Sequence, residues 1–208
     1  MIRVIKTMRY ASIRKLDITN GEGVGVALFV QGCHFHCKNC FNSCTWDFDG
    51  GMEWNEKTKE HFLSLLDRDY IERVSILGGE PLANENVGEV YDIISTIREK
   101  YPSKKIWLYS GYNFSRILNE SIYNFSLTGE SDKYVTARAM SALSVDVMVD
   151  GLFVDELKDY SLHWKGSSNQ RVINIKTTYE KYIKKMRVHR GLIYDNEAFV
   201  DECIDIIE

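Results

Sequence analysis

Short apolar runs that alternate with helical patterns constrain the fold of this 208-residue chain more than any other feature. Runs this short, rich in β-branched and aromatic residues, are typical of buried strands. Apolar residues spaced three or four apart are typical of helices instead. The strand-like runs lie at 26–31, 73–77, 105–109 and 144–149, and 171–175 is a candidate fifth.

Helical patterns separate these runs. They cover 55–66, 87–101 and 114–125, and a shorter one ends at Ala142 after a polar stretch, 126–134, that we expect to be a loop. Strands alternating with helices at this spacing predict parallel βαβ units with right-handed crossovers. We therefore expect an α/β fold, in the form of an open or partial parallel β/α barrel.

The expected strands end at unusual motifs. The first runs into a cysteine loop, and the next three are followed by GGEP (78–81), YSGY (109–112) and VDG (149–151). In α/β folds of this kind the chemistry gathers at the C-terminal ends of the strands. We expect one active face on a single domain, 1–177, with 178–208 as a C-terminal extension that is helical in part and packs on or follows that domain.

The overall composition narrows the class of protein. A net charge of −4 argues against a general affinity for nucleic acid, which requires a basic surface. The N-terminal residues lack the apolar core of a signal peptide, and no stretch is long and apolar enough to span a membrane. We expect a cytoplasmic protein without a membrane partner, in which clustered cysteines are more often metal ligands or catalytic groups than disulfides.

The cysteine loop has the spacing Cys33-x3-Cys37-x2-Cys40, with Cys44 three residues beyond. Thiolates bind soft metals, so the candidates are zinc and an iron–sulfur cluster. Three thiolates on one loop can ligate three irons of a cubane 4Fe-4S cluster, which leaves the fourth iron free for a small molecule. Two alternatives remain at this point: a zinc site completed by a neighbouring histidine, and an electron-transfer cluster closed by Cys44.

The spacing C-x3-C-x2-C followed by an aromatic residue, here Phe41, resembles the signature of the radical S-adenosylmethionine superfamily. The resemblance implies a partial barrel of the radical SAM type and a 4Fe-4S cluster held by Cys33, Cys37 and Cys40. It also implies that the open iron binds S-adenosyl-L-methionine. An electron from the reduced cluster would then split this cofactor into methionine and a 5'-deoxyadenosyl radical.

The GGEP motif strengthens this resemblance. Two glycines allow the backbone to approach a ligand closely, and the glutamate that follows supplies an acceptor. The motif is similar to the GGE motif of the superfamily, which holds the amino group of the cofactor. By this resemblance the cofactor contacts are Gly79 and Glu80, together with Asn39, Cys40 and Phe41.

Three further segments resemble the activating enzymes of anaerobic (class III) ribonucleoside-triphosphate reductases. They are 17–33, the stretch FNSCTWD at 41–47, and the long run 146–173. The resemblance extends over about residues 8–175, while a longer segment at 121–142 and the tail beyond Thr177 depart from it. It implies a glycyl-radical activase, an oxidoreductase that removes a hydrogen atom from one glycine of the large reductase subunit after reduced flavodoxin or ferredoxin supplies an electron.

The run 146–173 also contains candidate residues that line the site or dock the protein partner. They are Asp150, Gly151, Trp164, Ser167, Ser168, Asn169 and Gln170. A simple turn at 150–151 and an ordinary polar loop at 166–170 would explain the same residues.

Other functions stay open on sequence grounds. The partner could be a different glycyl-radical enzyme of the formate-lyase type, or the substrate a small molecule such as a deazapurine precursor. An electron-transfer module that binds its cluster through all four thiolates would require neither GGEP nor Phe41. We expect Cys44 to lie outside the ligand set.

Overall fold

A computed structural model describes residues 7–128, 132–188 and 197–207. Within these ranges, no helix is both long enough and apolar enough to cross a membrane. The described strands form one sheet in the order β3-β1-β2-β4-β5-β6-β7. They are β1 (Arg9–Asp17), β2 (Gly25–Val30), β3 (Met52–Glu53), β4 (Arg73–Gly78), β5 (Lys105–Ser110), β6 (Val147–Asp150) and β7 (Arg171–Asn174).

The centre of this sheet agrees with the expected parallel units, whereas its edges do not. Strands β2, β4, β5 and β6 run parallel to one another. Strand β7, expected to continue the parallel set, is antiparallel to β6, because the chain returns from the long loop 151–170 without a helical crossover. The nine-residue strand β1 was not predicted; it pairs antiparallel with β2 and β3. The fold is α/β, with a mixed sheet.

The helices lie mainly between the predicted bounds. They are α1 (Glu56–Ser64), α2 (Val87–Lys100), α3 (Phe114–Thr128), α4 (Lys133–Leu143), α5 (Ile175–Val188) and α6 (Glu197–Asp201), with short 3-10 helices η1 (Ser43–Thr45) and η2 (Asp155–Leu157). The expected loop at 126–134 is wrong at both ends. Residues 126–128 continue α3, Asp132 caps α4 by accepting from the N–H groups of Tyr134 and Val135, and 129–131 lie outside the described residues.

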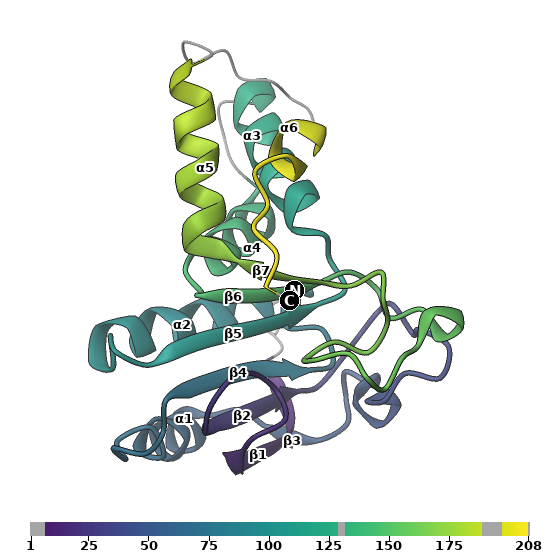
Figure 1. Ribbon diagram of the computed structural model, residues 1–208. Helices are drawn as coiled ribbons and strands as arrows, with labels where there is room; N and C mark the ends of the chain where they lie inside the picture. Colours follow the sequence, from purple (N-terminus) through teal and green to yellow (C-terminus); the bar gives the residue numbers. More distant parts are fainter. Residues whose placement is uncertain (1–6, 129–131, 189–196, 208) are drawn as a thin grey trace, which may run out of the picture.

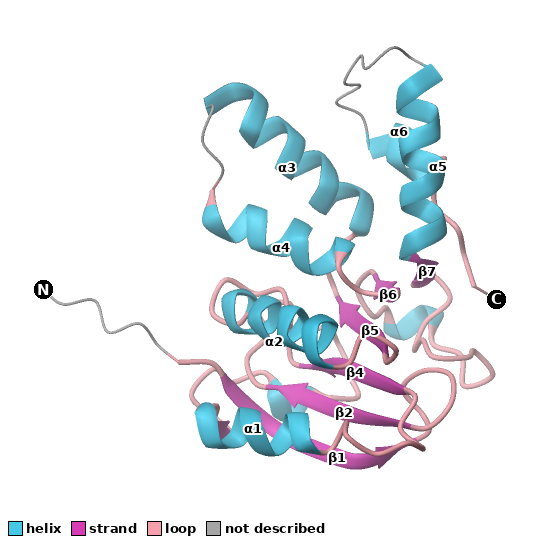
Figure 2. Cartoon of the chain, turned by 90° about the vertical axis from the view of Figure 1, so that its left-hand side faces the viewer, coloured by secondary structure: helices cyan, strands magenta, loops and turns pink. Residues whose placement is uncertain are grey.

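The two faces of the sheet carry different side chains. Val26, Leu28 and Val30 of β2 belong to the main core beneath α1, α2 and α4, whereas Ala27 and Phe29 point to the other face. Figure 2 shows these helices on one side of the strands. Figure 1 shows the loop after β2 and the loop between β6 and β7 side by side at one end of the sheet. Among the described residues, one face and one end of the sheet therefore carry no α-helix, and only the short 3-10 helices η1 and η2 lie in the two loops at that end.

A buried ion pair ties the end of β1 to β4. The guanidinium of Arg73, with no exposed surface, donates to the Asp17 carboxylate at 2.7 Å and to the Glu22 carbonyl at 3.1 Å. The same carboxylate accepts from the Thr19 hydroxyl and from the side-chain amide of Asn20. This network folds segment 17–24 across the helix-free face of the sheet.

The C-terminal segment adds to the outer edge of β7. The Ile207 N–H donates to the Val172 carbonyl at 2.7 Å, and the Asn174 N–H donates to the Asp205 carbonyl at 2.8 Å. An isolated bridge joins Ile173 to Ile206. Part of the segment 178–208 is thus attached to the same sheet as the strands that precede it.

Candidate active site

Residues that follow the four parallel strands line a cavity of about 400 Å³ at the C-terminal ends of those strands. The motifs expected at the strand ends therefore come together. They contribute Cys33, Cys37 and Cys40 after β2, Gly79 and Glu80 after β4, Ser110 and Gly111 at the end of β5, and Gly151 after β6.

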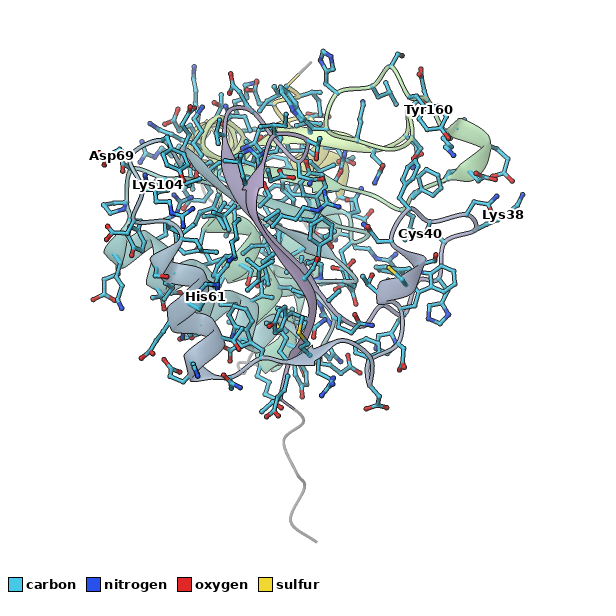
Figure 3. All side chains as sticks on the ribbon, turned by 90° about the horizontal axis from the view of Figure 1, so that it is seen from below. Lys38, Cys40, His61, Asp69, Lys104 and Tyr160 are labelled. Carbon is cyan, nitrogen blue, oxygen red and sulfur yellow. The ribbon has the colours of Figure 1, made fainter. Side chains whose placement is uncertain are left out.

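Backbone hydrogen bonds shape the cysteine loop. The Cys33 N–H donates to the Trp46 carbonyl at 3.0 Å, and the Cys40 N–H donates to the Cys37 carbonyl at 3.1 Å. Burial raises the pKa of the Cys33 and Cys37 thiols, so binding of a metal as thiolate requires release of their protons. Figure 3 shows Cys40 on the same side of the molecule as Lys38 and Tyr160.

Cys44, the fourth cysteine of the loop, is exposed and does not line the cavity. It belongs to η1, and its carbonyl accepts a long hydrogen bond from Gln31 at 3.4 Å. Three cysteines of the loop thus line the cavity and the fourth lies outside its lining.

The positions of the cysteines suit a cluster better than a site for a single metal ion. Among the described residues, no three side chains of histidine, cysteine, aspartate or glutamate converge on a site for one ion. A cubane cluster makes a different demand, because its cysteine ligands bind separate irons. Three free thiols from one loop, all facing one cavity, fit that demand.

The two glycines of GGEP are required by contacts within the protein. A Cβ on Gly78, whose φ is 109°, would lie 2.8 Å from the Phe29 Cα. A Cβ on Gly79 would lie 2.4 Å from the Gly32 carbonyl oxygen. The sequence analysis attributed these glycines to the approach of a ligand, whereas here they let β4 and its turn lie against β2 and the start of the cysteine loop.

Glu80 is almost fully buried and faces the cavity, and its hydrogen bonds are with neutral groups. Its carboxylate accepts from the Ser110 hydroxyl at 2.7 Å, from the Gly111 N–H at 2.8 Å and from the Leu82 N–H at 2.9 Å. Burial raises the pKa of Glu80 to about 7, although the hydrogen bonds act in the opposite direction. Of the roughly four acceptor sites of a carboxylate, one is left for a further donor, such as an amino group.

The predicted cofactor contacts after Cys37 separate into two groups. Phe41 lines the cavity with Cys40, and its ring packs against Phe153 at 5.2 Å between centroids. Asn39 does not line the cavity. Its backbone is left-handed, with φ of 54°, and its side-chain amide donates to the Asp155 carboxylate at 2.6 Å. The Asn39 side chain thus joins the cysteine loop to the loop after β6.

Asp150, predicted on the partner side, is instead a buried framework residue. It is 1% exposed and accepts from the guanidinium of Arg171 and from the Phe114 N–H. It therefore fixes β6 to β7 and to the start of α3. The adjacent Gly151 has a φ of 98° and lines the cavity.

The loop 166–170 is held by its own amide side chains. The Gln170 amide oxygen accepts from the Gly166 N–H at 2.9 Å, and its nitrogen donates to the Gly151 carbonyl at 2.9 Å. The Asn169 amide donates to the Leu152 carbonyl at 2.8 Å. Gln170 lines the cavity, whereas Asn169 does not.

Three other residues of this run differ in position. Ser168 is exposed and makes a backbone hydrogen bond to Leu157, while Ser167 is buried. Trp164 lines the cavity and packs edge-on against Trp107 at 5.1 Å. The run 146–173 thus contributes some residues to the cavity lining and others to the outer surface.

Several lining residues were missed by the sequence analysis. Arg14, Thr19 and Asn20 come from β1 and the turn after it, and Trp46 and Tyr109 come from segments already singled out. The turn 17–20 lies in segment 17–33, which resembles the activating enzymes. This resemblance was the signal that could have placed the turn at the site. The Trp46 indole N–H and the Tyr109 hydroxyl are buried without a hydrogen-bond partner in the described part of the chain.

Known proteins are similar to this chain over most of its length. Residues 19–173 match a family model described as a 4Fe-4S single cluster domain. The chain is 33% identical over 171 residues to the anaerobic ribonucleoside-triphosphate reductase-activating protein of Escherichia coli (strain K12), a match that covers 81% of this chain and 100% of the relative. The protein of the same name from Enterobacteria phage T4 is 32% identical over 165 residues, covering 79% of this chain and 93% of the relative.

Proposed function

We propose that this chain, which belongs to the family of anaerobic ribonucleoside-triphosphate reductase-activating proteins, is a radical S-adenosylmethionine enzyme that generates a glycyl radical on such a reductase. One observation carries the proposal. In a chain similar to these relatives over 100% and 93% of their length, three cysteines of a C-x3-C-x2-C loop line one cavity together with the GGE residues 78–80 and the ends of the other parallel strands.

Three thiols would hold the 4Fe-4S cluster: Cys33, Cys37 and Cys40. With S-adenosyl-L-methionine bound, the reduced cluster supplies one-electron cleavage and hydrogen-atom abstraction; the protein supplies binding, orientation and a cavity. The family model for a 4Fe-4S single cluster domain supports the cluster. We assign Cys44 no ligand role, because it is exposed and lies outside the cavity lining.

The turn after β4 would hold the cofactor. Donors from β5, from the Gly111 N–H that follows it and from the turn of Glu80 itself hold this carboxylate, so its one remaining acceptor site would meet the cofactor without rearrangement of the side chain. Phe41, at the rim beside Phe153, would shield one side of the cofactor from water. Gly79 contributes backbone at the same level. Asn39 would act indirectly, through its hydrogen bond to the loop after β6.

The protein substrate would enter from the open end of the sheet. The loop after β6 borders the cavity through Gly151, Trp164 and Gln170, and its exposed residues Ser168 and Asn169 would meet the reductase. A reduced flavodoxin or ferredoxin is the proposed electron donor. We regard 1–177 as the catalytic unit, a partial barrel of the radical SAM type, and 178–208 as its extension.

Cleavage of the cofactor tests the first part of the proposal. After anaerobic reconstitution and reduction, the protein should convert S-adenosyl-L-methionine to 5'-deoxyadenosine. Variants Cys33→Ala, Cys37→Ala and Cys40→Ala should lose the iron–sulfur absorbance and all cleavage, whereas Cys44→Ala keeps both. Loss of the cluster in Cys44→Ala would instead favour a four-thiolate electron carrier.

Electron paramagnetic resonance tests the second part. The reduced protein, mixed with S-adenosyl-L-methionine and an anaerobic ribonucleoside-triphosphate reductase, should produce a glycyl radical signal on the reductase. A signal obtained only with a formate-lyase-type enzyme would show that the protein activates that class of partner instead. The same mixture with Cys37→Ala serves as the blank.

A further inference from the structure

A row of side chains forms the floor of the cavity on the helix-free face of the sheet. Phe29, Leu77, Tyr109 and Val149 come from the four parallel strands, and all four line the cavity. Phe29 is paired with Leu77 in the sheet, and Tyr109 is paired with Val149. The row is apolar except for one hydroxyl group.

That hydroxyl belongs to Tyr109 and is buried without a hydrogen-bond partner among the described residues. Burial raises the pKa of Tyr109, so the group stays protonated and remains a donor. Buried polar groups are nearly always hydrogen-bonded, and an unpaired one in a cavity indicates a missing partner. The hydroxyl is therefore suited to a ligand with an acceptor.

Polar neighbours on the same side of the cavity are already engaged. The Thr19 hydroxyl and the Asn20 amide both donate to the Asp17 carboxylate. The guanidinium of Arg14 lies over the Phe29 ring at 4.4 Å. Their existing contacts leave the Tyr109 hydroxyl as the unpaired donor of the floor, while the indole N–H of Trp46 is an unpaired donor elsewhere in the described cavity lining.

The floor lies one level below the residues assigned to the cofactor. Ser110 and Gly111, which follow Tyr109 directly, bind Glu80 at the ends of the strands, the level of the cysteine loop. A cofactor bound to the cluster would occupy that upper level. The deeper, apolar level is left for the group from which hydrogen is taken.

Resting on the proposed function, we propose that the Tyr109 hydroxyl donates a hydrogen bond to a main-chain carbonyl oxygen of the reductase segment that carries the target glycine. A glycine has no side chain, so an enzyme can locate it only through backbone groups and the space around them. A single donor in an apolar floor matches a peptide carbonyl flanked by Cα–H groups. Tyr109 is thus a positioning residue for the peptide.

The substitution Tyr109→Phe tests this, because it removes only the hydroxyl. The probe is a synthetic peptide of the reductase around the target glycine, and its affinity is measured by calorimetry with the reconstituted enzyme. We expect affinity to fall roughly threefold to tenfold, the value of one net hydrogen bond. The affinity for S-adenosyl-L-methionine and its cleavage without peptide should stay unchanged.

Thermal stability separates positioning from a structural role. Removal of an unpaired buried hydroxyl should leave the unfolding temperature of the free protein unchanged or raised. A matched control is Tyr112→Phe, three residues further on, outside the cavity lining and packed against Phe35 at 5.0 Å. It should not change peptide affinity.

Each other outcome would overturn the inference. Unchanged peptide affinity in Tyr109→Phe would show that the hydroxyl has no role in the peptide complex. Weaker cofactor binding would assign it to S-adenosyl-L-methionine, and a clear drop in unfolding temperature would make it structural. A wild-type protein that cleaves the cofactor but does not bind the peptide would overturn the inference and leave the cofactor chemistry standing. Absence of cleavage in the wild type would refute the proposed function itself.

Discussion

Asp17 and Glu80 are both buried carboxylates at the borders of one cavity, with exposed fractions of 3% and 2%. Asp17, the last residue of β1, binds the guanidinium of Arg73. Glu80, after β4, accepts hydrogen bonds from a hydroxyl and two N–H groups, all uncharged. The two regions thus differ mainly in whether a counter-charge is buried with the carboxylate.

The difference appears in their acid–base behaviour. Burial alone would raise the pKa of Asp17, but hydrogen bonds and the charge of Arg73 lower it below its usual value. Burial prevails at Glu80 and raises its pKa to about 7. The comparison shows that a buried carboxylate without a bound cation stays able to change protonation near neutral pH, while a paired one is fixed as part of the framework.

The largest expected effect comes from breaking the ion pair. Arg73→Met should reduce the free energy of unfolding by about 3–5 kcal/mol, because the Asp17 charge stays buried without its partner. Chemical denaturation measures the loss. The double variant Asp17→Asn with Arg73→Met should recover part of it, since no charge is then buried. A loss below about 1 kcal/mol, the range of exposed ion pairs, would show that Arg73 does not compensate a buried charge on Asp17.

The pH dependence of stability should have opposite signs at the two sites. The folded-state pKa of Glu80 lies above its unfolded value of 4.5, so its contribution is complete below that pH and is lost as pH rises through about 7. The stabilisation lost between pH 4.5 and pH 7 amounts to about 3 kcal/mol. The contribution of Asp17, whose pKa is lowered, is present above its unfolded value of 3.8 and is lost as pH falls through its folded pKa.

Unfolding curves of the wild type, Glu80→Gln and Asp17→Asn over this pH range would separate the two terms. The difference between wild type and Glu80→Gln should slope downward from acid toward neutral pH. A flat difference would show that Glu80 does not hold its proton in the folded protein.

A smaller loss should follow from Glu80→Gln at neutral pH. The amide nitrogen would face an N–H donor where the carboxylate accepted one, leaving a buried group unpaired at about 1–3 kcal/mol. Cofactor affinity should fall as well. Glu85→Gln is a matched control, because that carboxylate binds His34 at the surface, outside the cavity lining. Equal losses of stability and of cofactor affinity in Glu80→Gln and Glu85→Gln would show that Glu80 has no role specific to the cavity.

The smallest effect should come from the rim. Lys38 binds Glu156 at 2.9 Å, with side chains 71% and 68% exposed, so Lys38→Ala should leave the unfolding midpoint unchanged. Denaturation at low and high salt checks this. Destabilisation as large as that of Glu80→Gln would mean that the rim stabilises the fold as strongly as the buried region does.

The pattern of apolar residues predicted the central strands. It also predicted that the motifs that follow these strands lie at one end of the sheet. Residues 105–110 form β5 because their apolar side chains pack on both faces of the sheet, a pattern that is visible in the sequence. Residues 9–17, in contrast, carry alternating polar and half-buried side chains, and without their partner strand nothing marks them as β1. The direction of β7 likewise depends on the path of the loop before it.

The features that the sequence did not predict depend on contacts between residues that are far apart along the chain. Arg73 reads as a charge within a strand, and its partner Asp17 lies 56 residues earlier, so neither residue alone predicts the pair. Asp150 was assigned to the partner side from its motif, yet its ion pair with Arg171 forms only when β6 and β7 are adjacent. Such residues are placed by topology, which short motifs do not contain.

The contact between Gly79 and Gly32 limits how this site can be rebuilt elsewhere. The Glu80 N–H donates to the Gly32 carbonyl at 2.7 Å, and the Gly79 N–H donates to the Val30 carbonyl at 2.9 Å, so the turn after β4 and the start of the cysteine loop share one backbone framework. A designer who transplants C-x3-C-x2-C alone onto a new scaffold would carry over the thiols without the surface against which their loop is formed. The smallest transferable unit is two neighbouring parallel strands with both turns, taken together.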